Sequence, residues 1–278
     1  MSENNKNVHS LYSFAYCGTD QGFNNMLSYL AKIAEPEIWS FKSDPEGKLS
    51  ILRYYIFHTF TQCHLQGKIL YSLDRKWCCI NTGLMTSNGK EILMLFNENQ
   101  KSGENKAKWF LKGFKSCVER DYMDLFSGIP DLASYTEDFN DFYFNPDFKI
   151  EINTDHILDD NWSRISNEIG LDKSVVKVLL TGIVEITQKR VRRNMRLAVP
   201  QYYKDEIMYL LPLQIPVSDN KTVTMALAIE KTSTNQYRAN TIFTREMAYE
   251  KARLLMKPES NWLIENEKRE ANDASRPD

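Results

Sequence analysis

The residues with the clearest potential for chemistry are five cations between positions 188 and 196, where the chain reads Gln-Lys-Arg-Val-Arg-Arg-Asn-Met-Arg. Apolar spacing predicts a helix over Ser174–Leu197, capped by Ser174 and followed by a proline at position 200. At about 100° per residue, Lys189, Arg192, Arg193 and Arg196 fall within an arc of roughly 100°, with Arg190 on the flank. A phosphate backbone is bound by several fixed positive charges, and the planar arginine side chain clamps phosphate oxygens bidentately. We therefore predict that this helix binds phosphate.

The opposite face of the same helix is expected to pack against a core. Its residues are Val176, Leu180, Ile183, Val184, Thr187, Val191 and Ala198. Two other interpretations of the cations stay open. Cations are favoured at a helix C-terminus anyway, and Glu185 can pair with Lys189 four residues later. Residues 121–160, here called the acidic segment, hold eleven acids and one base and can dock on the cations as an internal partner.

Polar and aromatic residues near the cations extend the candidate site. Asn194 and Gln201 can read the polar edges of a ligand, and Tyr202 can stack on a base. A packed aromatic corner is the alternative interpretation of Tyr202. Asn81 and Thr82 precede a glycine directly after an apolar strand, and they complete the pocket if the sheet brings them near. A simple hairpin turn is the alternative for these two residues.

The sequence also limits the reaction classes. It has no P-loop, no dinucleotide-binding glycine motif, no serine-hydrolase elbow and no zinc-protease motif. His58 and His64 lie on different faces of one predicted helix, so they cannot share a metal. The run Asp155–Asp160, which includes His156, has carboxylates suited to a hydrolytic metal, but such runs are usually solvated. We expect no metal site and no cofactor.

Three functions remain open from the residues alone. The first is a domain that binds a phosphate-bearing ligand, RNA or a nucleotide. The second is a nucleotide- or RNA-processing enzyme, in which the same cations hold the phosphate while Glu230 or an acid between 155 and 160 acts as base. The third is a protein-interaction module whose basic face meets an acidic partner. Whether the protein is an enzyme is not decided by the sequence.

The bulk composition is that of a globular protein, with 42% hydrophobic and 26% charged residues. A net charge of −2 gives no overall attraction to nucleic acid or to an anionic membrane, so any polyanion site must be local. Residues 1–10 are polar and lack the apolar core of a signal peptide, and no run approaches the ~18 apolar residues that span a bilayer. Its five irregularly spaced cysteines predict reduced, mostly buried thiols. We expect a cytoplasmic protein with no membrane partner.

Local patterns predict the elements around the long helix. Two helices are expected at 22–34 and 48–66. Strands are expected at 68–73, 77–81, 91–96, 108–117, 207–216, 223–231 and 237–243, and a last helix is expected at 244–256. Asn88-Gly89 predicts a hairpin, and residues 120–160 read mostly as loop and short helix. Because strands and helices are grouped rather than alternating, the predicted class is α+β, an antiparallel sheet with packed helices. We expect a single domain over residues 11–264, between a flexible arm at 1–10 and a disordered tail at 265–278.

Four stretches of the chain resemble one bacterial family, the domain of unknown function numbered thirty-eight twenty-five. They are Asn81-Thr82-Gly83-Leu84; residues 189–194 running into 198–202; Leu211-Pro212-Leu213; and residues 247–263, with Met247-Ala248-Tyr249, Ala252-Arg253-Leu254, Lys257-Pro258 and Trp262-Leu263. Together they span roughly residues 50–263, and their order and spacing make the likeness fairly specific. The resemblance implies one domain and carries no established activity.

Overall fold

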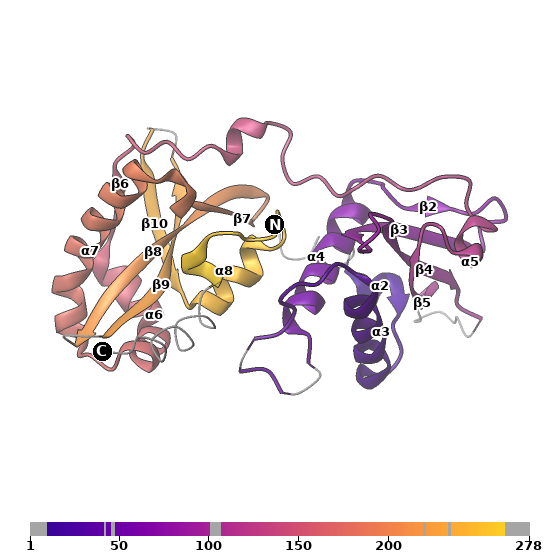
Figure 1. Ribbon diagram of the computed structural model, residues 1–278, viewed down its shortest axis with the longest axis horizontal. Helices are drawn as coiled ribbons and strands as arrows, with labels where there is room; N and C mark the ends of the chain where they lie inside the picture. The colour runs from indigo at the N-terminus through magenta and orange to yellow at the C-terminus, as the bar shows by residue number, and fades with distance from the viewer. Residues whose placement is uncertain are drawn as a thin grey trace, which may run out of the picture. The chain divides into compact units, whose positions relative to one another are not determined.

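The structure is a computed structural model that describes residues 10–41, 43–45, 48–100, 107–218, 221–232 and 235–264. The chain divides into two compact units, unit 1 ending at Ser134 and unit 2 beginning at Tyr135. Each unit holds one five-stranded, mostly antiparallel sheet with packed helices (Figure 1). The predicted α+β class is confirmed, although the sequence indicated one sheet and the structure has two. Residues 1–9 of the predicted arm and the whole predicted tail lie outside the described residues.

From residue 10 on, where its description starts, unit 1 has three helices and a short strand, and then forms a meander. Its elements are α2 (Leu11–Phe14), β1 (Ala15–Tyr16), α3 (Asp20–Ile33), α4 (Ser50–Leu65), β2 (Leu70–Tyr71), β3 (Trp77–Met85), β4 (Glu91–Glu98), β5 (Trp109–Ser116) and α5 (Arg120–Met123). The strand order is β1-β5-β4-β3-β2. All neighbours are antiparallel except β1, which joins β5 in parallel. The predicted hairpin at Asn88-Gly89 is the β3–β4 turn, where Gly89 adopts a φ of 67°.

The core of unit 1 lies between the sheet and α2–α4, which stand together on one side of the strands in Figure 1, with α5 on the other. Phe14 is central to this core, because its ring meets Phe60 at 5.0 Å, Phe96 at 5.4 Å and Trp109 at 5.9 Å. A smaller cluster beneath α5 buries part of the opposite face of the sheet. Its members are Cys79, Leu93, Leu95, Tyr122 and Phe126.

Unit 2 contains the long basic helix and the second meander. Its elements are η1 (Phe139–Phe142), β6 (Ile150–Glu151), α6 (Thr154–Ile169), α7 (Lys173–Arg193), η2 (Met195–Leu197), β7 (Val199–Tyr203), β8 (Glu206–Ser218), β9 (Lys221–Lys231), β10 (Tyr237–Phe243), α8 (Arg245–Ala252) and α9 (Asn261–Ile264). The strand order is β6-β10-β9-β8-β7, with β6 parallel to β10 and the other neighbours antiparallel. The meander is confirmed, while β1, β6 and β7 were not predicted.

Helices α6 and α7 cover one face of this sheet and α8 the other (Figure 1). The main core lies on the α6–α7 side and includes Leu180, Leu211, Leu227 and Tyr237. Helix α6 fills part of the region predicted as loop, because Asn153 caps it by accepting the backbone N–H of His156 at 3.2 Å. None of the helices in the described ranges is long and apolar enough to cross a membrane.

The two units share one order of elements. In each, a two-residue strand is the first strand, two long helices follow it, and a four-stranded meander ends beside that strand. The first strand pairs in parallel with the last one in both sheets. The helices between them act as the crossover that a parallel pair requires. The sequence shows no internal repeat, so this correspondence appears only in the fold.

Candidate functional site

The apolar face of α7 positions its cations. Val176, Leu180, Ile183, Val184, Thr187 and Val191 are all buried, as the spacing predicts. Thr187 adds a buried hydrogen bond, since its hydroxyl donates to the carbonyl of Pro212 on β8 at 3.0 Å. With this face fixed on the sheet, the opposite face of the last turns is exposed, including Lys189, Arg192 and Arg193.

The helix ends earlier than predicted, at Arg193 rather than Leu197. Asn194 leaves the helical conformation with φ −147° and ψ 90°, and its side chain accepts the backbone N–H of Arg196 at 3.2 Å. Asn194 therefore starts the short helix η2, so Arg196 lies beyond the end of α7 and not on one continuous helical face. The N-terminal cap also differs, because the capping position is Asp172 instead of Ser174.

The C-terminal segment holds the η2 turn in place. The Ser260 hydroxyl donates to the carbonyl of Arg196 at 2.6 Å, and the Trp262 indole N–H donates to the carbonyl of Leu197 at 3.0 Å. These bonds fix the backbone of Arg196 and leave its side chain exposed. We call Lys189, Arg190, Arg192, Arg193 and Arg196 the basic cluster.

Part of the acidic segment lies against the basic cluster. The Tyr209 hydroxyl donates to the carbonyls of Asp141 and Tyr143, at 2.7 and 2.9 Å, and fixes the chain near η1 on the sheet. Beyond this point, the carbonyl of Pro146 accepts a hydrogen bond from Nε of Arg192 at 3.0 Å, and the Asp147 carboxylate lies 3.6 Å from the same guanidinium. Internal pairing with the acidic segment therefore exists, but Asp147 is its only acid that pairs with the cluster among the described residues.

The remaining cations have fewer internal partners. Arg190 donates to Gln214 on β8, and the Arg193 side chain donates to the backbone carbonyl of Lys189 one turn earlier, at 2.9 Å. Within the described part of the chain, the side chains of Lys189 and Arg196 make no hydrogen bond or ion pair, and Glu185 does not pair with Lys189. Both are exposed cations that a ligand can reach.

Gln201 and Tyr202 are less available than the sequence suggested. Gln201 is only 2% exposed, because it faces the α8 side of β7, and its Oε1 has no hydrogen-bond partner among the described residues. The Gln201 side chain is therefore closed off from solvent in this structure. Tyr202 is half-buried; its ring meets Tyr135 edge-on at 4.9 Å and its hydroxyl donates to Asp205 at 3.0 Å.

Asn81 and Thr82 belong to unit 1, while the basic cluster belongs to unit 2. They are 1% and 0% exposed and form a bulge in β3. Asn81 accepts the backbone N–H of Gly83 at 2.9 Å and donates to the carbonyl of Pro130, and the Thr82 hydroxyl donates to the carbonyl of Ile92. Both side chains therefore make hydrogen bonds that shape the bulge of the sheet.

The acids proposed as a general base lie elsewhere. Asp155 pairs with Lys177 and Asp159 with Lys173, both at 2.5 Å, at the start of α7. At 1.5 Å per residue, Lys173 is about 24 Å along the helix from Lys189. Glu230 pairs with Arg238 at 3.1 Å. Lys173 lowers the pKa of Asp159, which weakens it further as a base.

A pocket that the sequence did not reveal lies beside α7. It has a volume of about 920 Å³ and lies against β6, α7 and β10. Glu185 and Gln188 contribute from α7, and Gln188 immediately precedes the basic cluster. Its walls carry two negative side chains, Glu151 and Glu185, and two positive ones, Lys149 and Arg238, so these charges cancel. Because these residues come from elements far apart in the chain, no local pattern could have indicated the pocket.

A comparison with protein families finds a match that covers most of the chain. A family model described as a domain of unknown function, DUF3825, matches residues 30–262 and so includes every residue proposed above for the site. No curated protein and no solved structure matches the chain. The matched range extends from α3 to α9, through both units. The chain therefore belongs to the DUF3825 family.

Proposed function

We propose that this protein binds a phosphate-bearing ligand, RNA or a nucleotide, through the basic cluster. The observation that carries the proposal is that five cations are exposed within eight residues, while only Asp147 among the described acids pairs with them. Fixed cations next to one another release counterions from a polyanion when it binds. Lys189 and Arg196 are the strongest candidates for phosphate contact, because neither is held by a partner among the described residues.

The basic cluster is also positioned in advance, which lowers the entropic cost of binding. Thr187 anchors α7 to β8, Arg193 closes the last turn, and Ser260 holds the turn that carries Arg196. Arg192 is oriented by Pro146 and exchanges the exposed carboxylate of Asp147 for a phosphate at small cost, since exposed ion pairs contribute little.

An enzymatic use of the same cations finds less support. The ion-paired acids of the run 155–160 lie at the opposite end of α7, and a general base must be within hydrogen-bond reach of its proton. We also propose a cytoplasmic location, supported by five free thiols, of which four are buried.

The test is binding of fluorescein-labelled single-stranded RNA to the full chain, measured by anisotropy at increasing KCl concentration. The variant Lys189→Gln/Arg196→Gln removes the two cations that have no partner in the described part of the chain, and Lys189→Gln/Arg193→Gln/Arg196→Gln removes a third. If each contacts one phosphate, the triple variant lowers the slope of log K against log salt by about 2. A matched control, Lys173→Gln/Lys177→Gln, removes two cations from the start of the same helix.

Unchanged binding by the folded triple variant, or an equal loss in the control, would overturn the proposal. Competition identifies the ligand class, because a nucleotide that displaces the RNA at low concentration indicates a small ligand. Displacement by an acidic peptide alone, with no RNA binding, would instead favour a protein-interaction module.

A further inference from the structure

A row of three side chains crosses the open face of the sheet in unit 1. Asn97 of β4 lies opposite Phe110 of β5, and Phe110 lies opposite Tyr16 of β1. Residues opposite one another on neighbouring strands point to the same face. The flanking residues Trp109 and Leu111 are buried on the helix-covered face, so the row faces away from α2–α4. The cluster beneath α5 covers other parts of this face but does not include the row.

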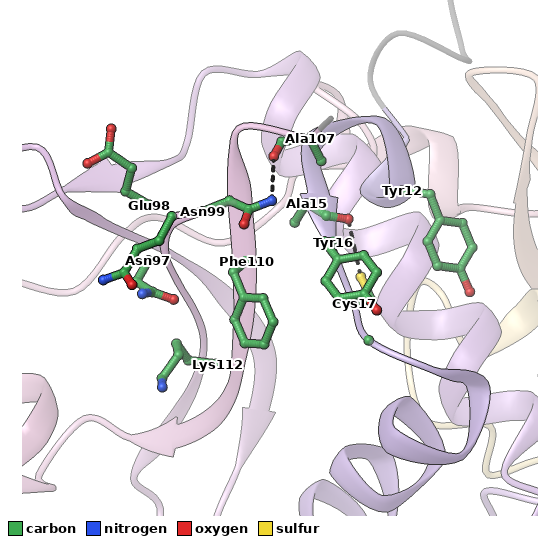
Figure 2. A pocket seen from close by; sticks show the side chains of 12 residues that line it. Tyr12, Ala15, Tyr16, Cys17, Asn97, Glu98, Asn99, Ala107, Phe110 and Lys112 are labelled. Atoms are coloured by element: carbon green, nitrogen blue, oxygen red, sulfur yellow. Dashed lines mark hydrogen bonds between the residues drawn. The ribbon is translucent and has the colours of Figure 1, made fainter. Parts of the chain in front are cut away.

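The row lines a pocket of about 880 Å³, which Figure 2 shows from close by. The rings of Tyr16 and Phe110 stand next to one another, with centroids 5.9 Å apart and planes tilted by 43°. Lys112, Asn97 and Glu98 lie on the other side of Phe110 from Tyr16 in this view. Tyr16 is 52% exposed, although it lies on a strand of the sheet.

The charge of this pocket argues against a bare phosphate as its occupant. Lys112 and Glu98 are the charged side chains on its walls within the described residues, so their charges balance. The other polar walls come from the amides Asn97, Asn99 and Gln100, which carry both donors and acceptors. Asn99 braces the rim by donating to the carbonyl of Ala107 at 3.0 Å. Such walls fit a neutral planar ring whose edges carry donors and acceptors.

Asn97 adds a specific signal. Its Oδ1 is buried without a hydrogen-bond partner in the described part of the chain. Leaving a buried acceptor unsatisfied is costly, so such atoms are few in folded proteins. An N–H donor on a ligand edge, placed over Phe110, would satisfy this oxygen when the Asn97 side chain adjusts toward the pocket.

We infer that this pocket binds a nucleobase, stacked on Phe110 and Tyr16 and read at its edge by Asn97. Lys112, at the bulge of β5, lines the same pocket as Phe110 and is placed to meet the phosphate attached to that base. Open aromatic rings beside a lysine on a sheet are the arrangement that stacks successive bases of a single strand. The base can belong to a free nucleotide or to single-stranded RNA. This site is in unit 1 and does not depend on the basic cluster of unit 2.

The experiment uses two probes on the full chain. Adenosine, cytidine, guanosine and uridine are titrated separately by calorimetry, because a nucleoside carries the base without a phosphate and so tests the pocket apart from the basic cluster. Labelled single-stranded RNA is then cross-linked by ultraviolet light, and the tryptic peptides are identified by mass spectrometry. We expect adducts on the peptide Trp109–Lys112, which contains Phe110, and on the peptide that contains Tyr16.

Variants quantify the stacking. Phe110→Ala is expected to weaken RNA binding about 5- to 150-fold, the range that loss of one stacked base gives, and Phe110→Tyr to retain it. Phe139→Ala removes an exposed ring of unit 2 that lies outside the pocket and serves as control. Tyr16→Ala repeats the test on the edge strand if Phe110→Ala fails to fold.

Each outcome decides the inference. A nucleoside that binds alone indicates a free nucleotide, and RNA binding with Phe110 adducts but no nucleoside binding indicates a single strand. The inference fails if neither probe binds, if the adducts are confined to unit 2, or if folded Phe110→Ala binds RNA like the wild type. If the pocket of unit 1 fails these tests but the Lys189→Gln/Arg196→Gln variant still loses RNA binding, the nucleobase inference is wrong and the proposed function stands.

Discussion

In unit 1 the edge strand β1 places Tyr16 opposite Phe110, whereas in unit 2 the corresponding strand β6 places Glu151 opposite Arg238. Tyr16 and Glu151 are each the second residue of a two-residue strand. In both units that strand pairs in parallel with the last strand of the meander. One hydrogen-bonded framework thus presents two aromatic rings in one sheet and two opposite charges in the other. The sheet topology fixes the position of each residue pair, and the side-chain types determine which ligands the pair can bind.

The long helices differ in the same way. Helix α4 ends in a turn whose only basic residue is His64 and is followed by Gly67 at a φ of 66°, whereas the last turn of α7 holds three arginines. Both helices pack a buried face on their own sheet. The basic cluster is therefore a property of unit 2 and not a consequence of the shared topology.

If each sheet has its own core, a large-to-small substitution in either core should lower the free energy of unfolding. Phe96→Ala removes a fully buried ring of unit 1 that contacts Phe14 and Phe60, and we expect a loss of about 3–5 kcal/mol in the free energy of unfolding. Leu227→Ala in unit 2 should cost about 2–5 kcal/mol. Urea unfolding followed by circular dichroism measures both, and a loss below about 1 kcal/mol would contradict the core assigned to that unit.

The bulge of β3 distinguishes the first sheet and can be tested at Gly83. Its φ is 73°, and an added Cβ would lie 2.7 Å from the Tyr55 hydroxyl, which donates to the carbonyl of Thr82 at 2.9 Å. We expect Gly83→Ala to cost roughly 2–4 kcal/mol, from the strained backbone and the displaced hydrogen bond.

Gly67→Ala is the matched control, because Gly67 has a φ of 66° and open space around its Cβ position. It should cost only about 1–2 kcal/mol in the same unfolding assay. Equal losses at the two glycines would show that Tyr55 does not hold the bulge.

All five cysteines belong to unit 1, so high pH should affect its thiols before the buried tyrosines of unit 2. Burial raises the pKa of Cys63 from 9.0 to about 11 and the pKa of Cys17 and Cys79 to about 12. The folded state therefore keeps protons that the unfolded chain releases. This stability is complete below pH 9.0 and is lost as the pH rises toward the folded pKa values, by up to about 1.4 kcal/mol per thiol and pH unit.

Urea unfolding below and above pH 9.0 measures this loss, with Cys63→Ala/Cys79→Ala as the comparison. The variant should show a shallower decline with pH than the wild type. Identical declines would mean that the buried thiols are not the titrating groups.

The smallest effect is expected at the charged pair of the second sheet. Glu151 is exposed and makes no ion pair among the described residues, while Arg238 already pairs with Glu230. Glu151→Ala should change the free energy of unfolding by less than about 0.5 kcal/mol in the urea assay. A loss above about 1 kcal/mol would show that β6 depends on this charge for its pairing.

Much of the secondary structure followed from the sequence, because the signals are local. The apolar stripe of α7, the hairpin at Asn88-Gly89 and the strands β8–β10 each depend on residues a few positions apart. The end of α7 was placed too late, because the Asn194 side chain competes for a backbone N–H that a longer helix would have used. Strands β1 and β6 were missed, because two residues give no period and their pairing partners lie far along the chain.

The candidate sites also depend partly on local signals and partly on contacts between distant segments. The sequence alone determined that Lys189, Arg190, Arg192 and Arg193 lie together at the end of an amphipathic helix, because residues on a helix have fixed relative directions. Tertiary structure alone decided that Asp147 reaches Arg192, that Gln201 is buried, and that Asn97, Phe110 and Tyr16 form one row. Those outcomes depend on contacts between segments far apart in the chain, which sheet pairing and burial select from many alternatives that a single sequence leaves open.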